Sequence, residues 1–325
     1  MLYFSYKHDD PRIGGDRDYI TYYYSMYLSP LDLTAARPPA IYRQLSAIAT
    51  HLVYATGIFY PNDISFHPDG YDQRVFFAAL FTNYICLVIT AWLAGTIVQQ
   101  ELKARAFIPA TLAGLICLLS FHTQVSVITG LTEGPSWLLF ASAFLFYLRR
   151  QSLPIVIVFV LAIFQREVIL TLFAGIAGLA ALTRSDERRF EGFVLAASVV
   201  CFIIYFLMRK MIVLPFSEVR AHMDPWAWLR NLRNFQLSWG LVFQGFLSQN
   251  LLWIYTVSAA LAARRQREWP FWLPVLLGSF LILAGIDILT AEGNNLGRYG
   301  SMLSPVLAAL ITVTWIRMER SSPHA

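Results

Sequence analysis

The chain has 325 residues, of which 57% are hydrophobic and 14% are charged, and its mean hydropathy is +0.53. Ordinary soluble domains carry about 25% charged residues, so the composition excludes a typical soluble domain and indicates a polytopic α-helical membrane protein. The net charge of +5 does not indicate nucleic-acid binding, because the basic residues stand at the ends of apolar runs, as the orientation of membrane proteins requires.

Residues 1–74 are polar or amphipathic and are predicted to lie on the outer face of the membrane. Within this segment, 41–59 places its apolar residues on one helical stripe and its polar residues off that stripe. The stripe consists of Ile41, Leu45, Ile48, Leu52, Ala55 and Phe59. Such a stripe predicts an interfacial helix that lies on the bilayer. The alternative is that 44–60 crosses the membrane, which places residues 1–43 in the cytoplasm.

Apolar runs then follow one another along the chain. They occupy 75–98, 106–127, 135–148, 153–164, 168–182, 191–213, 240–263, 271–289 and 299–316. The arms 153–164 and 168–182 are too short to cross, because the first rises only about 18 Å against a hydrocarbon core of roughly 30 Å. The Trp-rich stretch 225–239 predicts a second interfacial helix. We therefore predict one all-α domain over 1–325. Its transmembrane helical bundle, at 75–325, has about seven full spans and a short-helix hairpin, accompanied by interfacial helices.

The charges of the connectors favour a hairpin at 153–182 over a single crossing. If the two short helices enter and leave on one side, most basic residues fall on the cytoplasmic side, as the positive-inside rule requires. The cytoplasmic set is then Lys103, Arg105, Arg149, Arg150, Arg184, Arg188, Arg189, Arg264, Arg265, Arg267, Arg317 and Arg320. The outer set is only Arg220, Arg230, Arg233 and Arg298. A single crossing makes the two sets nearly equal.

The hairpin tip carries the sequence "QRE", which places Arg166 and Glu167 inside an apolar run. A charged group within a membrane costs at least a few kcal/mol, so such residues are usually functional. Adjacent helical residues do not face each other, and each of the two is therefore expected to have its own partner in a polar cavity or within the protein. The alternative is an Arg–Glu pair that neutralises itself between helices.

On this topology the conspicuous charged residues gather on the outer face. They are Asp16, Asp18, Arg37, Arg43, Glu133, Arg166, Glu167, Glu292 and Arg298. A carboxylate can act as general base on an acceptor hydroxyl, and arginines can bind a phosphate through two parallel hydrogen bonds. Plainer interpretations also exist: the aspartates suit a turn, Glu133 suits the start of a helix, and Arg298 suits an anchor at the interface.

The order of short motifs resembles that of a known family. "GGDRDYITYYY" is followed by "ARPPAIYR", by "TE" at 132–133, by "REV" at 166–168 and by "GRYGSMLSPVL" at the last helix. This order resembles the GT-C superfamily of integral membrane glycosyltransferases, which use polyprenyl-phosphate-linked sugars, and the resemblance covers most of the chain. In that family the first outer loop carries a catalytic Asp and lies between the first two spans. The resemblance therefore implies a member without the usual first transmembrane helix.

The resemblance implies Asp18, or Asp16, as the catalytic base. It implies Arg37, Arg43 and Arg166 as phosphate-binding groups. Glu133, Glu167 and Arg298 join the predicted substrate-binding set because they belong to the charged residues of the outer face. The implied reaction is transfer of a sugar from a polyprenyl-phosphate donor at the outer face of a bacterial inner membrane. The sugar, the acceptor and any divalent metal stay open, although the six histidines show no ligand spacing. Alternative functions are a transporter or flippase, for which broken helices around charged residues are typical, and a non-catalytic membrane subunit of a larger complex.

Overall fold

The computed structural model describes residues 23–32, 42–58, 72–103, 106–120, 132–211, 250–289 and 300–321, and these ranges contain helices and no strand. The all-α prediction is thus confirmed for this part of the chain. The helices are α3 (Tyr24–Leu28), α4 (Gln44–Ala55), α5 (Gln73–Leu102), α6 (Phe107–Leu119), α8 (Glu133–Leu148), α9 (Ser152–Ile163), α10 (Glu167–Thr183), α11 (Arg188–Met211), α15 (Asn250–Gln266), α16 (Trp272–Leu289) and α18 (Ser304–Arg320), with short 3-10 turns η3 (Ser185–Glu187) and η4 (Ser301–Leu303).

Three of the described helices are long and apolar enough to cross a membrane: Gln73–Leu102, Arg188–Met208 and Ser301–Arg320. Shorter apolar helices are α6, α9, α10 and the Trp272–Gly285 part of α16. The chain thus carries the candidate spans of a membrane protein. The helix from Ser301 lies at the centre, because 78% of its apolar window is buried, whereas α11 is peripheral, with only 28% of its window buried.

The helical hairpin predicted at 153–182 is present as α9 and α10. The chain reverses at Phe164–Arg166, where the amides of Gln165 and Arg166 both donate to the carbonyl of Ala162. The start of α9 and the end of α10 lie close together, because Arg150, which precedes α9, and Arg184, which follows α10, both form ion pairs with Glu187. The segment is therefore two antiparallel helices and not one crossing.

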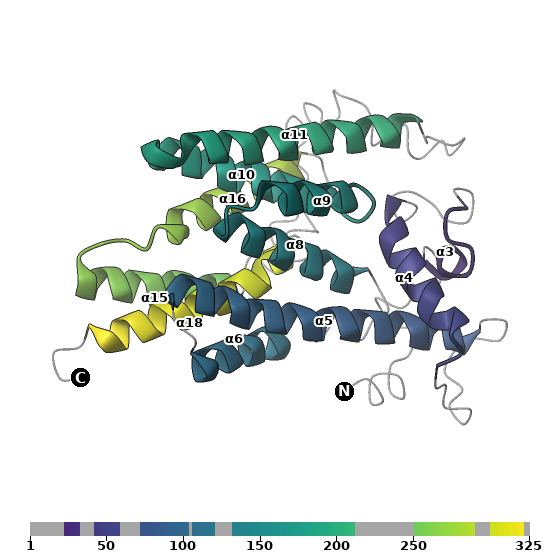
Figure 1. The fold of residues 1–325 in the computed structure, drawn as a ribbon, viewed down its shortest axis with the longest axis horizontal. Coiled ribbons are helices and arrows are strands. Elements are labelled where there is room, and N and C mark those ends of the chain that lie inside the picture. The colour runs from purple at the N-terminus through teal and green to yellow at the C-terminus, as the bar shows by residue number, and fades with distance from the viewer. Residues whose placement is uncertain are drawn as a thin grey trace.

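The bundle has two chemically different ends (Figure 1). At the α4 end lie α3, α4, the first turn of α5 and the hairpin turn. At the opposite end lie the last turns of α5, α8, α10, α15 and α18, several of which carry arginine, and we call this the basic end. Basic residues that the connector charges predict on one side, among them Lys103, Arg150, Arg184 and Arg317, line a single cavity here.

Helix α4 lies across the α4 end and does not run along the bundle (Figure 1). Its length, about 18 Å, is too short for a full crossing, which speaks against a span at 44–60. Its protein side is small and polar: Gln44, Ser46, Ala47 and Thr50 are buried. Part of its apolar stripe faces outward, with Leu52 62% exposed. This distribution suits an interfacial helix that turns its apolar side to lipid.

A buried polar cluster at the α4 end

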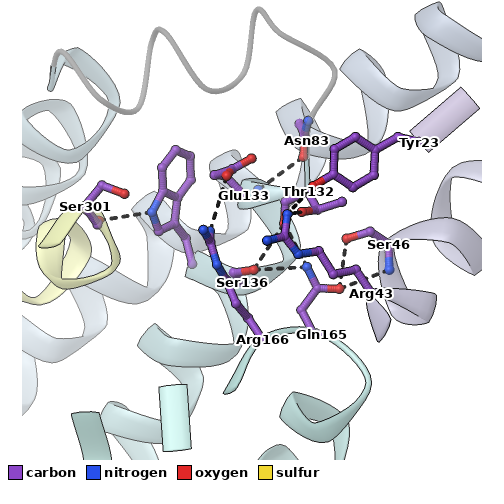
Figure 2. Close-up of polar contacts among 12 residues, drawn as sticks. Tyr23, Arg43, Ser46, Asn83, Thr132, Glu133, Ser136, Gln165, Arg166 and Ser301 are labelled. Carbon is purple, nitrogen blue, oxygen red and sulfur yellow. Dashed lines mark hydrogen bonds and ion pairs between the residues drawn. The ribbon is translucent and has the colours of Figure 1, made fainter. Parts of the chain in front are cut away.

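Helix N-termini converge at the α4 end, and polar side chains fill the space between them. α4, α8, α10 and η4 all begin here, and Figure 2 shows their side chains directed toward one another. Each helix N-terminus leaves backbone amides without partners inside its own helix. The convergence therefore requires hydrogen-bond acceptors at this place, and the chain supplies them from side chains and from the hairpin turn.

Arg166 and Glu133 form a buried ion pair within the cluster. The Arg166 guanidinium lies 3.2 Å from Oε1 of Glu133, and the two side chains are 2% and 1% exposed. Arg166 is the extended residue that precedes α10, and Glu133 is the first residue of α8. A carboxylate at a helix N-terminus is favoured by the helix dipole, so Glu133 has a structural reason to stand here as well as a charge partner.

Gln165 is the residue that ties the hairpin turn to its neighbours. Its Oε1 accepts from the amide and the hydroxyl of Ser46 at 3.1 and 2.8 Å, and its Nε2 donates to the carbonyl of Thr132 at 2.7 Å and to Oγ of Ser136 at 3.0 Å. The carbonyl of Phe164 accepts from the amide of Leu45 at 3.0 Å. The turn therefore caps the N-terminus of α4, which has no side-chain cap of its own.

Arg43 brings a second guanidinium to the cluster from the residue before α4. It donates to the hydroxyl of Tyr23 and, at 2.9 Å, to Oγ1 of Thr132. The guanidinium carbon also lies 5.7 Å from the centre of the Tyr23 ring, within range of a cation–π contact. Because Arg43 is only half-buried, it is closer to solvent than Arg166 and is the better placed of the two to meet a ligand.

The long central helices are fixed to the same cluster by two further hydrogen bonds. The amide of Gly134 donates to Oδ1 of Asn83 in α5 at 3.1 Å, and the indole of Trp137 donates to the carbonyl of Ser301 at 3.0 Å. Apolar spans cannot leave such groups unpaired without a large cost. The cluster thus joins α4, α5, α8, the hairpin and the start of the last helix.

A second polar junction joins the α3–α4 pair to the start of α5. Asp72 accepts hydrogen bonds from Arg74 and from the hydroxyl of Tyr54, and its own amide donates to the hydroxyl of Tyr24. The hydrogen bonds from Arg74 hold the pKa of the Asp72 carboxyl below its usual value. Burial raises the pKa of the Tyr27 phenol in α3, and the neighbouring Tyr23 raises it further. Both groups therefore stay in one protonation state at neutral pH.

The structure brings together some of the residues predicted from sequence. Arg43, Glu133 and Arg166 share the cluster, and Arg166 pairs with Glu133 and not with the adjacent Glu167. Glu167 begins α10 and is half-buried. The remaining predicted residues lie outside the described ranges: Asp16, Asp18, Arg37, Glu292 and Arg298.

Several members of the cluster were not predicted. They are Tyr23, Ser46, Asn83, Thr132, Ser136 and the amide of Gln165. The available signal was an uncharged polar residue inside an apolar run, as at Asn83 and Ser136, but a single such residue is also compatible with a hydrogen bond to its own helix.

The cluster combines positive groups with one carboxylate, because Arg43 and Arg166 lie beside Glu133, which pairs with Arg166. Two guanidinium groups lie among several helix N-termini, whose dipoles favour negative charge, and broken helices present such N-termini to anionic groups in membrane proteins. Within the described ranges, no group of three or more histidine, cysteine, aspartate or glutamate side chains is arranged to hold a metal ion.

No family model, curated protein or solved structure matches the chain.

Proposed function

We propose that the protein is an integral membrane glycosyltransferase that transfers a sugar from a polyprenyl-phosphate donor, with its reaction at the outer face of a bacterial inner membrane. The observation that carries the proposal is the gathering of Arg43, Arg166 and Glu133 at one end of the bundle, among converging helix N-termini. The order of motifs in the sequence also supports the proposal. We further propose that the bundle has about seven full spans.

The proposed reaction assigns a different task to each charged residue. Asp18 takes the proton of the acceptor hydroxyl as that oxygen attacks the anomeric carbon, and the bond from this carbon to the phosphate oxygen breaks. Arg43 binds the phosphate, on which negative charge develops as the polyprenyl phosphate departs. Arg166, being buried against Glu133, keeps the cluster assembled around Arg43. Arg37, Glu167 and Arg298 remain candidates for contacts with the donor and the acceptor.

The test compares three variants in liposomes supplied with a polyprenyl-phosphate sugar. Asp18→Asn preserves volume but cannot accept a proton usefully, so turnover should fall about 10²-fold or more while donor binding is retained. Arg43→Lys keeps the charge but loses the planar fork, so donor affinity should fall by about 1.5–3 kcal/mol. Arg74→Lys is the matched control, because Arg74 is exposed and pairs with Asp72 outside the cluster.

The contradicting results are equally specific. Normal turnover in Asp18→Asn removes the catalytic assignment, and equal losses in Arg43→Lys and Arg74→Lys remove the phosphate site at Arg43. The near-complete burial of Arg166 and Glu133 favours a second candidate, a non-catalytic membrane subunit. That candidate predicts that Arg166→Lys and Arg43→Lys lower the amount of folded protein while the purified protein consumes no lipid-linked sugar.

A further inference from the structure

A cavity of about 500 Å³ lies at the basic end of the bundle, opposite the polar cluster. Its charged lining consists of Glu101, Lys103, Arg150, Arg184, Glu187 and Arg317. Tyr147, Tyr255, Phe271 and Trp272 add aromatic surface. The volume falls within the range of small-molecule sites, about 300–1,000 Å³, and none of these residues belongs to the proposed transfer site.

The ion pairs around the cavity leave an excess of one positive charge. Arg150 pairs with Glu187 and, at 2.9 Å, with Glu191, and Arg184 shares Glu187. Arg317 lies 3.5 Å from the carboxylate of Glu101. With Lys103, which is exposed, four cationic side chains stand against three carboxylates, of which Glu191 is fully buried behind Arg150 and lies outside the cavity lining. The site as a whole suits a ligand group with a single negative charge.

Aromatic rings hold one of the arginines in place. The guanidinium carbon of Arg184 lies 3.5 Å from the ring centre of Phe271 and 5.6 Å from that of Trp272. Stacking fixes the plane of a guanidinium and leaves its edge to donate hydrogen bonds. Arg184 is about one-third exposed and Arg317 is 49% exposed, so both reach solvent from the wall of the cavity.

If α5 crosses the membrane, its length places the cavity at the depth of the lipid headgroups. α5 has 30 residues and rises about 45 Å, which exceeds the roughly 30 Å hydrocarbon core. Lys103 follows its last turn, so an α5 that spans the membrane carries Lys103 to the edge of the hydrocarbon or beyond it. Tyrosine and tryptophan side chains are typical of the same depth.

We propose that this cavity binds the phosphodiester headgroup of an anionic phospholipid from the adjacent leaflet. A phosphodiester carries one negative charge, which matches the excess of the site, whereas a free phosphate monoester carries about −1.5 to −2. The aromatic wall provides apolar surface for the glycerol and the first methylene groups, and basic pockets between transmembrane helices are typical sites for such headgroups. The site goes beyond the proposed function and does not depend on it.

Native mass spectrometry of the detergent-purified protein, titrated with phosphatidylglycerol, tests the proposal. The double variant Lys103→Gln/Arg317→Gln should weaken binding about tenfold or more. The matched control, Arg264→Gln/Arg265→Gln, removes two charges from the last turn of α15 outside the cavity lining and should leave binding within about twofold. Phosphatidylcholine, which has no net charge, should bind at least about tenfold more weakly than phosphatidylglycerol.

Three outcomes overturn the proposal. Equal losses in the two double variants show that general surface charge attracts the lipid. Competition by inorganic phosphate or glycerol 3-phosphate at concentrations similar to the lipid shows that the ligand is soluble. If Lys103→Gln/Arg317→Gln does not fold, Lys103→Gln alone is measured, because its side chain is exposed. Unchanged binding in that single variant also overturns the site.

Discussion

Arg166 and Glu133 stand 33 positions apart in the sequence and form an ion pair with almost no exposure. Removing two charges from water costs several kcal/mol for each ion, and their attraction offsets this cost only while both are present. The pair is therefore a strongly coupled unit. Its net contribution to stability is small compared with the penalty for leaving one member alone.

A double-mutant cycle measures this coupling at the residue scale. Arg166→Met and Glu133→Gln should each lower the free energy of unfolding by about 3–5 kcal/mol, and the double variant should lose much less than the sum. Arg74→Met with Asp72→Asn is the control, because that pair is more exposed and should couple by less than about 1 kcal/mol. The measurement is denaturant unfolding in detergent micelles. Additive losses at Arg166 and Glu133 contradict the coupling.

Charge is what made these residues predictable from the sequence. Arg43, Glu133 and Arg166 were singled out because ionised groups beside or inside apolar runs are rare, and the structure places all three together. Their partners could not be predicted, since pairing depends on which helix ends meet. Gln165, with four hydrogen bonds, has no charge and gave a weaker signal.

Close contact between α5 and α8 depends on the absence of a side chain at Gly134. A Cβ atom there would lie 2.6 Å from Oδ1 and 2.8 Å from Cα of Asn83, so Gly134→Ala has to push the two helices apart. We expect a loss of about 1–3 kcal/mol in the free energy of unfolding. At Gly192, in α11, no atom of the described residues lies within 4 Å of the added Cβ, apart from its chain neighbours and its own helix backbone. Gly192→Ala should therefore stabilise the protein by about 0.8–1 kcal/mol. Equal effects at both positions contradict the close packing.

The helices themselves followed from hydrophobic patterning, because each described helix from α5 to α18 overlaps an apolar run of the sequence. The helix α4 lies within the predicted stripe at 41–59, and its interfacial position stays a prediction. The start of α4 could not be predicted in the same way, because its cap comes from Phe164 and Gln165 and not from a residue at its own N-terminus. A cap supplied by a distant turn leaves no local sequence signal.

At the scale of the whole molecule, the α4 end and the basic end should face opposite sides of the membrane. Single cysteines at Ser29, Gln151 and Ser321, all exposed, test this after replacement of Cys86, Cys117 and Cys201 by alanine. An impermeant thiol reagent should label Ser29→Cys in intact cells, and it should label the other two only after permeabilisation. Labelling of Ser29→Cys and Gln151→Cys in intact cells would contradict the arrangement.

The pairing of ends was predictable because basic residues reveal which connectors share a side, and Arg150 and Arg184 do meet at Glu187. The cavity between them was not predictable. Glu191, buried beside Arg150 and Tyr147, is read from sequence as an ordinary residue near a helix start. The cavity forms only because several helix ends pack together around it, and the sequence does not show which ends meet.

The cap on α4 also sets an order of events during synthesis. Ser46 and Gln165 are 119 positions apart, and a ribosome adds about 5–20 residues per second. Gln165 therefore leaves the ribosome roughly 6–24 s after Ser46. During that interval the nascent α4 lacks the cap that it has in the folded protein, and it acquires this cap only once the hairpin turn has been made. Docking of α4 thus reports that half of the chain has been synthesised.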